Sequence, residues 1–224
     1  MNLQKIKGVI FDLDGTLIDS YQAIYLSFHH AYTRLGLPPL SPEEVKKVVG
    51  RGLGRTFGEL LGEERGAQAL SFFREKYKEV FRAHTHLLPD VRTVLEDLYG
   101  RGIQLAVATN KFGLFSREIF KHFKMESLFA VIVGDGDVPQ NKPHPAMLNF
   151  AIESMGLKKD ETVFVGDSVI DIQTAQNAGI RVYAVTTGNT PREDLENARP
   201  TAVLTRLLDL LKCVPIPSHP ETES

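Results

Sequence analysis

Short runs of apolar, largely β-branched residues recur along the chain, and each ends at a polar or glycine-containing turn. The first run covers residues 8–11 and stops at Asp12. Runs of this length without polar alternation are typical of strands buried on both faces of a parallel sheet. By the same pattern, we expect further strands at residues 103–108, 128–133, 162–165 and 181–185.

Segments with apolar residues at helical spacing separate these strands. They predict helices at residues 90–99, 113–123, 145–155 and 168–178, and glycines end several of them, as helix C-termini favour (Gly100, Gly102, Gly156, Gly179). Strands that alternate with helices indicate βαβ units. We therefore expect a doubly wound, three-layer α/β core, with a parallel sheet between two layers of helices.

The stretch from residue 17 to residue 88 breaks this alternation. Its apolar residues recur at three-to-four spacing and predict helices at residues 20–35, 42–49, 53–61 and 64–83, with no convincing strand. This predicts an α/β core made of residues 1–16 and 89–213, and an inserted helical domain of residues 17–88. Residues 214–224 are rich in proline and polar residues, so we expect a frayed tail there.

Composition indicates the class of protein, its expected partners and its cellular compartment. The chain has 224 residues, 42% of them hydrophobic and 24% charged, which fits a globular protein and not a disordered one. A net charge of −2 offers no basic excess, so we expect neither a nucleic-acid nor a membrane partner. A single cysteine, Cys213, excludes an internal disulfide and suits a reducing compartment. With no membrane span or secretory segment visible, we expect a cytoplasmic protein.

The first candidate for chemistry is the acidic segment Asp12-Leu13-Asp14-Gly15-Thr16, directly after the first buried strand. Ligands of open parallel sheets bind at the carboxyl ends of the strands. Carboxylates two residues apart on an extended segment point the same way, so Asp12 and Asp14 can share a divalent cation and divide the work of catalysis. The alternative is an acidic turn with no chemical role, which the position after a buried strand disfavours.

The second candidate follows the strand at residues 162–165. It contains Asp167, Ser168 and Asp171, and Ser168 is suited to cap the next helix. Asp167 and Asp171 lie four residues apart and so face the same side of the first helical turn. The alternative for Asp171 is an ordinary acidic residue at a helix N-terminus, where such residues are favoured anyway.

Two weaker signals complete the set. Thr109 and Asn110 end a strand ahead of a helix, where a hydroxyl and backbone N–H groups can bind an anion, although such residues are also common in turns. Lys142 lies in the proline-fixed loop Lys142-Pro143-His144-Pro145. An isolated lysine in such a loop is more often solvated than functional.

Taken together and in this order, the four segments resemble the motifs of the haloacid dehalogenase-like phosphohydrolases. The resemblance extends to about Leu211 and implies a Rossmann-like core in which the helical insert is a C1-type cap. Within that superfamily, the chain is similar to the phosphoglycolate phosphatase group. This implies a phosphatase that acts on a small phosphorylated metabolite, with 2-phosphoglycolate as the leading substrate.

The resemblance also implies a role for each residue. Asp12 is expected to be the nucleophile that forms an aspartyl-phosphate, and Asp14 the general acid and then base. Mg²⁺ is expected at Asp12, Asp167 and the backbone carbonyl of Asp14. Thr109, Asn110 and Lys142 are expected to bind the phosphoryl group, and Asp171 to orient Lys142 or a metal-bound water.

A further candidate lies in the helical insert. The resemblance makes the turn at residues 50–55 a substrate-specificity loop, with Arg51 as a donor to the substrate, whereas a plain helix–helix turn is the alternative. A β-phosphoglucomutase-like mutase, a pyrophosphatase of the same fold and, last, a non-catalytic binding module stay open as other functions. Whether the chain is a monomer or a homodimer is also left open.

Overall fold

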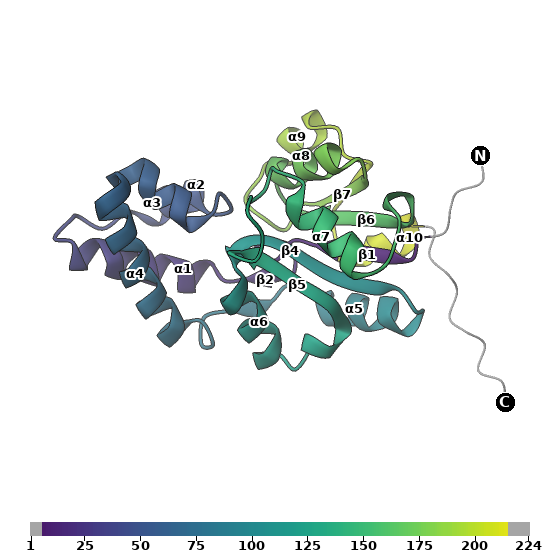
Figure 1. Ribbon diagram of the computed structural model, residues 1–224, viewed down its shortest axis with the longest axis horizontal. Coiled ribbons are helices and arrows are strands. Elements are labelled where there is room, and N and C mark those ends of the chain that lie inside the picture. The colour runs from purple at the N-terminus through teal and green to yellow at the C-terminus, as the bar shows by residue number, and fades with distance from the viewer. Residues whose placement is uncertain (1–5, 215–224) are drawn as a thin grey trace.

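A six-stranded parallel sheet forms the centre of the molecule in the computed structural model, which describes residues 6–214 (Figure 1). Its order is β5-β4-β1-β6-β7-β8, and every adjacent pair runs parallel. The strands are β1 (Gly8–Phe11), β4 (Gln104–Phe112), β5 (Phe129–Asp135), β6 (Thr162–Gly166), β7 (Arg181–Val185) and β8 (Ala202–Leu204). The predicted α/β class with a parallel sheet is confirmed.

Helices cover both faces of this sheet, because successive strand residues point to opposite sides. Val9 and Phe11 of β1 belong to one apolar cluster, and Ile10 between them belongs to the other. One face carries α5 (Val91–Gly100) and α6 (Gly113–His122), and the other carries α7 (Ala146–Ser154), α8 (Val169–Ala178) and α9 (Arg192–Asn197). Short helical turns complete the core: η1 (Glu126–Leu128), η2 (Lys159–Glu161), η3 (Leu207–Asp209) and α10 (Leu210–Cys213).

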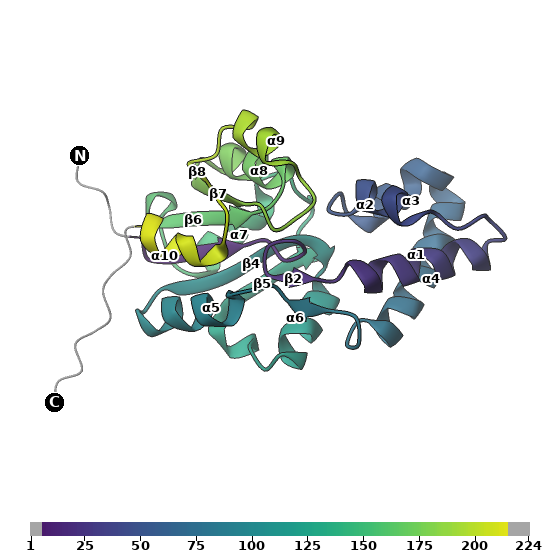
Figure 2. The ribbon, with the colours of Figure 1, turned by 180° about the vertical axis from the view of Figure 1, so that it is seen from behind.

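Four helices between β2 and β3 lie to one side of the sheet (Figures 1 and 2). They are α1 (Tyr21–Arg34), α2 (Pro42–Val48), α3 (Leu53–Leu61) and α4 (Glu63–Val80). Aromatic rings hold them together: the Phe28 ring lies 4.8 Å from that of Phe57 and 5.3 Å from that of Phe73, and all three side chains are buried. The helical insert therefore has apolar packing of its own.

The insert is joined to the core by two very short strands, and here the sequence prediction is wrong. β2 (Ile18–Asp19) and β3 (His86–Leu87) pair antiparallel where the chain leaves the core and where it returns. A strand of two residues is too short to show a periodicity. For this reason the sequence pattern predicts no strand between residues 17 and 88. The short strand β8 was missed for the same reason.

The described part of the chain ends at Val214, which packs against the core. Val214, the first residue of the expected frayed tail, is buried against the core cluster, and residues 215–224 lie outside the described residues. Among residues 6–214, no helix combines the length and the apolar character that crossing a membrane requires.

Candidate active site

The carboxyl ends of β1 and β6 lie side by side and bring the first two acidic segments together. The backbone N–H of Asp12 donates to the carbonyl of Val165 at 2.8 Å, which fixes the end of β1 against β6. The chain then turns at Gly15, which has a φ of +88°, and a Cβ there would crowd the carboxylate of Asp167. Glycine at this position thus lets the loop of β1 approach Asp167 closely.

Lys142 connects two of the buried carboxylates. Its Nζ lies 2.7 Å from Oδ1 of Asp12 and donates to Oδ1 of Asp171 at 2.6 Å, and its side chain is only 3% exposed. Attraction to these two carboxylates outweighs the effect of burial, which would lower the pKa of Lys142, so that its pKa is raised. The structure therefore makes Lys142 a buried, charged neighbour of Asp12 and not a solvated loop residue.

Asp171 is fixed at the start of α8. Its Oδ2 accepts hydrogen bonds from the backbone N–H and the hydroxyl of Ser168, at 3.0 and 2.5 Å, while the Ser168 oxygen accepts from the backbone N–H of Asp171. This is a capping box with an aspartate in the third position. Both oxygens of Asp171 are thus engaged, one by the helix cap and the other by Lys142.

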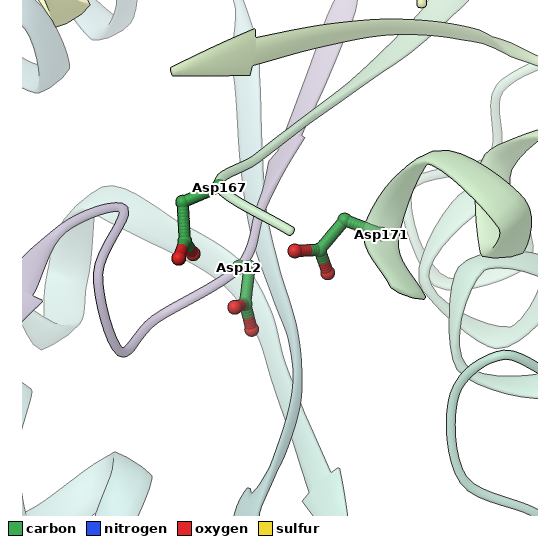
Figure 3. A group of neighbouring side chains, drawn as sticks. All are labelled: Asp12, Asp167 and Asp171. Carbon is green, nitrogen blue, oxygen red and sulfur yellow. The ribbon is translucent and has the colours of Figure 1, made fainter. Parts of the chain in front are cut away.

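Asp12, Asp167 and Asp171 form a compact acidic cluster (Figure 3). One carboxylate oxygen from each lies within 4.8 Å of the others, and all three residues are buried. Burial raises the pKa of Asp12 to about 6, and Lys142 offsets part of this shift. Burial and then repulsion from Asp171 and Asp12 raise the pKa of Asp167 well above its ordinary value.

This cluster fits a divalent cation. Three carboxylates face one lysine, so that two negative charges are left without a counter-charge among the residues that form the cluster. Oδ1 of Asp12 is buried and, despite its closeness to Lys142, has no aligned hydrogen bond. Gly188 leaves room beside Asp167, because a Cβ on Gly188 would overlap its carboxylate. Hard oxygen ligands with excess negative charge are what Mg²⁺ prefers.

Asp14 points to a different partner. Both of its carboxylate oxygens accept from Nζ of Lys111, at 3.0 and 2.9 Å, and Oδ1 also accepts from the hydroxyl of Ser20. Lys111 in turn donates to Ser20 at 3.2 Å and lies 4.7 Å from the centre of the Tyr77 ring on α4. The side chains of Asp12 and Asp14 therefore have separate cations.

Thr109 and Asn110 lie in the last part of β4, which runs on to Phe112 instead of ending at residue 108 as expected. The Thr109 oxygen accepts from the backbone N–H of Lys111 at 3.2 Å, which leaves the hydroxyl proton free to be donated. The Asn110 side chain accepts from the backbone N–H of Lys142 at 2.8 Å and donates to the carbonyl of Gly50 at 3.0 Å. Asn110 thus links the core to the loop between α2 and α3.

Except for Asp171, these groups line one cleft of about 590 Å³ between the sheet edge and the helical insert. Core residues form its floor, and the α2–α3 loop with α1 and α4 forms its other walls (Asp12, Asp14, Thr109, Lys111, Lys142, Asp167; Arg51, Ile24, Phe73, Tyr77). Arg51 reaches this cleft but is exposed. Asp171 is not part of the lining; it lies behind Lys142.

Sequence reading did not assign a role to Lys111, Tyr77 or Ser20. The only sequence signal for Lys111 is a lysine directly after a Thr-Asn pair at a strand end. Nothing in the pattern shows that Tyr77 reaches it, because Tyr77 reads as a core residue of an amphipathic helix.

Comparison with known proteins agrees with this arrangement. Residues 9–185 match the family model of the haloacid dehalogenase-like hydrolases. A phosphoglycolate phosphatase of Vibrio parahaemolyticus is 34% identical over 96% of this chain and 99% of its own length. Phosphoglycolate phosphatase 1 of Pseudomonas aeruginosa is 34% identical over 92% of this chain and 78% of its own length.

Solved structures agree as well. The crystal structure of a predicted phosphoglycolate phosphatase from Haemophilus somnus superposes with a TM-score of 0.86 at 30% identity, over 95% of this chain and 99% of that one. A predicted phosphatase from Clostridium acetobutylicum gives 0.86 at 28% identity, over 94% and 98%. The protein is thus an enzyme whose relatives are phosphatases: the chain belongs to the haloacid dehalogenase-like hydrolases and resembles the phosphoglycolate phosphatase group among them.

Proposed function

We propose that this enzyme is a Mg²⁺-dependent phosphomonoester hydrolase that works through an aspartyl-phosphate on Asp12. The observation that carries the proposal is the position of Asp12. Its carboxylate is buried at the floor of the cleft, next to Lys142 and within the acidic cluster with Asp167 and Asp171. The leading substrate is 2-phosphoglycolate, on the strength of the names of the relatives.

The metal would be held by Asp12 and Asp167 together with the backbone carbonyl of Asp14. When bound, Mg²⁺ would offset the excess carboxylate charge and draw negative charge from the phosphoryl oxygens. Lys142 would serve the same end, since it is buried and positively charged beside Asp12. Neutralisation of this kind is what lets a carboxylate approach an anionic phosphoryl group.

Two transfers then account for the hydrolysis. In the first, a carboxylate oxygen of Asp12 bonds to phosphorus, the ester P–O bond breaks, and the leaving oxygen takes a proton from Asp14. In the second, a water gives its proton to Asp14 and attacks phosphorus, which releases inorganic phosphate and restores Asp12. The Thr109 hydroxyl would donate to a phosphoryl oxygen; its proton is free for this, and it lines the same cleft.

The helical insert is proposed to act as a cap that closes over the cleft. Its residues already form part of the cleft wall, and its α2–α3 loop is bonded to Asn110 of the core. Closure would exclude bulk water from the phosphorylated aspartate and select the leaving group. The proposed boundaries of this cap are residues 17 and 88, with residues 1–16 and 89–213 as the catalytic core.

The test is a phosphate-release assay on purified protein. The panel is phosphoglycolate, pyrophosphate, hexose phosphates, nucleoside monophosphates and p-nitrophenyl phosphate, each with Mg²⁺ and with EDTA. We expect activity on phosphomonoesters with Mg²⁺ and none with EDTA. Asp12→Asn should lower turnover by orders of magnitude, because no neighbouring group can replace a covalent nucleophile.

Asp137→Asn is the matched control, since Asp137 pairs with Arg117 on the surface and does not line the cleft. It should leave turnover unchanged. Full activity in EDTA would contradict the metal role, and substantial activity in Asp12→Asn would contradict the covalent route. Preference for pyrophosphate, or conversion of one hexose phosphate into another, would favour the pyrophosphatase or mutase alternatives.

A further inference from the structure

Lys111 is a buried cation in the cleft for which the proposed mechanism has no use. Its side chain is 6% exposed. Its Nζ contacts groups from three separate segments: Asp14 in the loop after β1, Ser20 just before α1, and the Tyr77 ring on α4. A lysine with this much contact is held in place, unlike the solvated lysines that usually border an active site.

The charge on Lys111 depends on Asp14. Burial would lower the pKa of Lys111, but the attraction of Asp14 and the contact with Tyr77 more than compensate, so that its pKa is raised. Lys142, the other buried lysine of the cleft, is engaged by Asp12 and Asp171. Among the described residues, Asp14 is the single carboxylate in ion-pair contact with Lys111.

The proposed reaction requires the Asp14 side chain to point in a different direction. To protonate the ester oxygen, Asp14 has to turn from Lys111 and Ser20 toward the phosphoryl group. Lys111 would then be left as a buried, unpaired charge, which is strongly unfavourable. A negative charge on the leaving group would restore the pair, because Lys111 lines the same cleft as Asp12 and lies 3.0 Å from the present position of the Asp14 carboxylate.

We propose that Lys111 determines substrate specificity by binding a carboxylate of the leaving group in exchange for Asp14. The inference rests on the proposed function and adds a substrate class: phosphomonoesters of short hydroxy acids, whose carboxylate lies one or two carbons from the ester oxygen. Among the other residues that line the cleft, Ile24 and Phe73 of the insert are apolar and have no hydrogen-bonding side chain, and the ring of Tyr77 lies against Lys111.

Arg51, the donor expected from the sequence, is a weaker candidate for this role. It is exposed, lines both the cleft and a more open neighbouring hollow, and its charge acts on Glu59 of α3. An exposed guanidinium has to give up water and conformational freedom before it binds a carboxylate. Lys111 is already buried and held in place, so binding a carboxylate would not cost it water or conformational freedom in the same way.

The test compares two non-hydrolysable phosphonates as competitive inhibitors of p-nitrophenyl phosphate hydrolysis. 3-Phosphonopropionate has the length and carboxylate of phosphoglycolate, whereas propylphosphonate has a methyl group in place of the carboxylate. We expect the wild type to prefer 3-phosphonopropionate by about ten- to a hundredfold, the range of one charge-assisted hydrogen bond. Calorimetry measures the same two affinities directly if a variant has lost its turnover.

Lys111→Met should reduce this preference to near unity and leave the affinity for propylphosphonate little changed. Lys111→Arg, which keeps the charge, should retain part of the preference, and Arg51→Ala should retain all of it. Tyr77→Phe is the packing control, because it keeps the ring that lies against Lys111.

The outcomes separate this inference from the proposed function. If the wild type binds the two phosphonates alike or binds neither, or if Lys111→Met keeps the preference, the role of Lys111 is overturned even where phosphomonoesters are hydrolysed. Loss of the preference in Arg51→Ala alone would assign the carboxylate to Arg51. If no phosphomonoester is hydrolysed, the proposed function fails, while the calorimetric preference and its loss in Lys111→Met would still support the carboxylate site.

Discussion

The residues of the acidic cluster lower the stability of the fold. Asp12, Asp167 and Asp171 crowd their negative charges in a buried place with one lysine among them. For Asp12 and Asp167, burial makes the protonated form more favourable than it is in water, so that their pKa values are raised. Such a cluster is typical of functional sites, where charge is placed for chemistry and not for folding.

The raised pKa values predict how stability depends on pH. The pKa of Asp12 rises from 3.8 in the unfolded chain to about 6 in the fold. Such a carboxyl makes its full contribution to stability at pH values below 3.8, where it is protonated in both states. This contribution is lost as the pH rises through the higher value. Without metal, the cluster therefore destabilises the fold at neutral pH, and Mg²⁺ should restore stability there.

Asp167→Asn should raise the free energy of unfolding of the metal-free protein at neutral pH, because it removes one of the crowded charges. The gain should shrink as the pH is lowered, and Mg²⁺ should stabilise the variant less than the wild type. Denaturant unfolding in EDTA and in Mg²⁺ measures both effects. Asp137→Asn is a control of opposite sign: hydrogen bonds to Arg117 and Gly134 lower the pKa of Asp137 against the effect of burial, so that this variant should lose stability. A destabilised Asp167→Asn would contradict the account.

At the scale of elements, the sequence predicts what depends on regular periodicity. The five longer strands and the helices between them were found because buried strands are continuous apolar runs and helices repeat every three to four residues. Asp12 and Asp167 were found with them, since they end predicted strands. β2, β3 and β8 have two or three residues and offer no pattern. The pair formed by Asp14 and Lys111 was not predictable, because it depends on how the loop after β1 lies beside the end of β4.

Two helices begin with the same type of cap, so a comparison of the two caps can distinguish an effect on stability from an effect on function. Ser168 caps α8 and also holds Asp171, whereas Ser41 forms a capping box with Glu44 at the start of α2, away from the acidic cluster. Replacing either serine with alanine should cost about 0.5–2 kcal/mol of stability. Only Ser168→Ala should also lower turnover, because Asp171 then loses the bond that orients it toward Lys142.

Thermal unfolding and steady-state kinetics on the two variants check this expectation. Equal turnover in Ser168→Ala and Ser41→Ala, at similar losses of stability, would show that Asp171 does not depend on its cap. A loss of turnover in Ser41→Ala would instead indicate that the position of α2 matters to the reaction.

At the scale of the whole molecule, the cleft lies between the helical insert and the carboxyl edge of the sheet. The helical insert has its own aromatic packing, and it joins the core through β2 and β3 (Figure 2). Aromatic packing also joins the two parts, because the Phe115 ring of α6 lies 4.9 Å from the Tyr77 ring of α4. Lys111 contacts Tyr77 and Asn110 contacts Gly50 across the two parts, and sequence reading of either part alone does not find these contacts.

Asn110 connects the two parts directly by hydrogen bonds. Its amide donates to the carbonyls of Gly50, at 3.0 Å, and Lys142, at 3.2 Å, so one side chain ties the α2–α3 loop to the loop that carries the buried lysine. Closing the insert over a substrate therefore uses a bond that also positions Lys142. Loss of that bond should favour the open arrangement and weaken substrate binding more than it weakens the fold.

Asn110→Ala should raise KM by roughly five- to thirtyfold, the equivalent of about 1–2 kcal/mol, and make the α2–α3 loop easier to cleave with a protease. Gln176→Ala is the matched control, because Gln176 also donates from its amide to a carbonyl, that of Ala198 at 2.9 Å, but within the core and away from the cleft. It should leave KM and the protease pattern unchanged. If the two variants behave alike, the Asn110 bond does not couple the insert to the site, and closure must depend on contacts such as that between Lys111 and Tyr77.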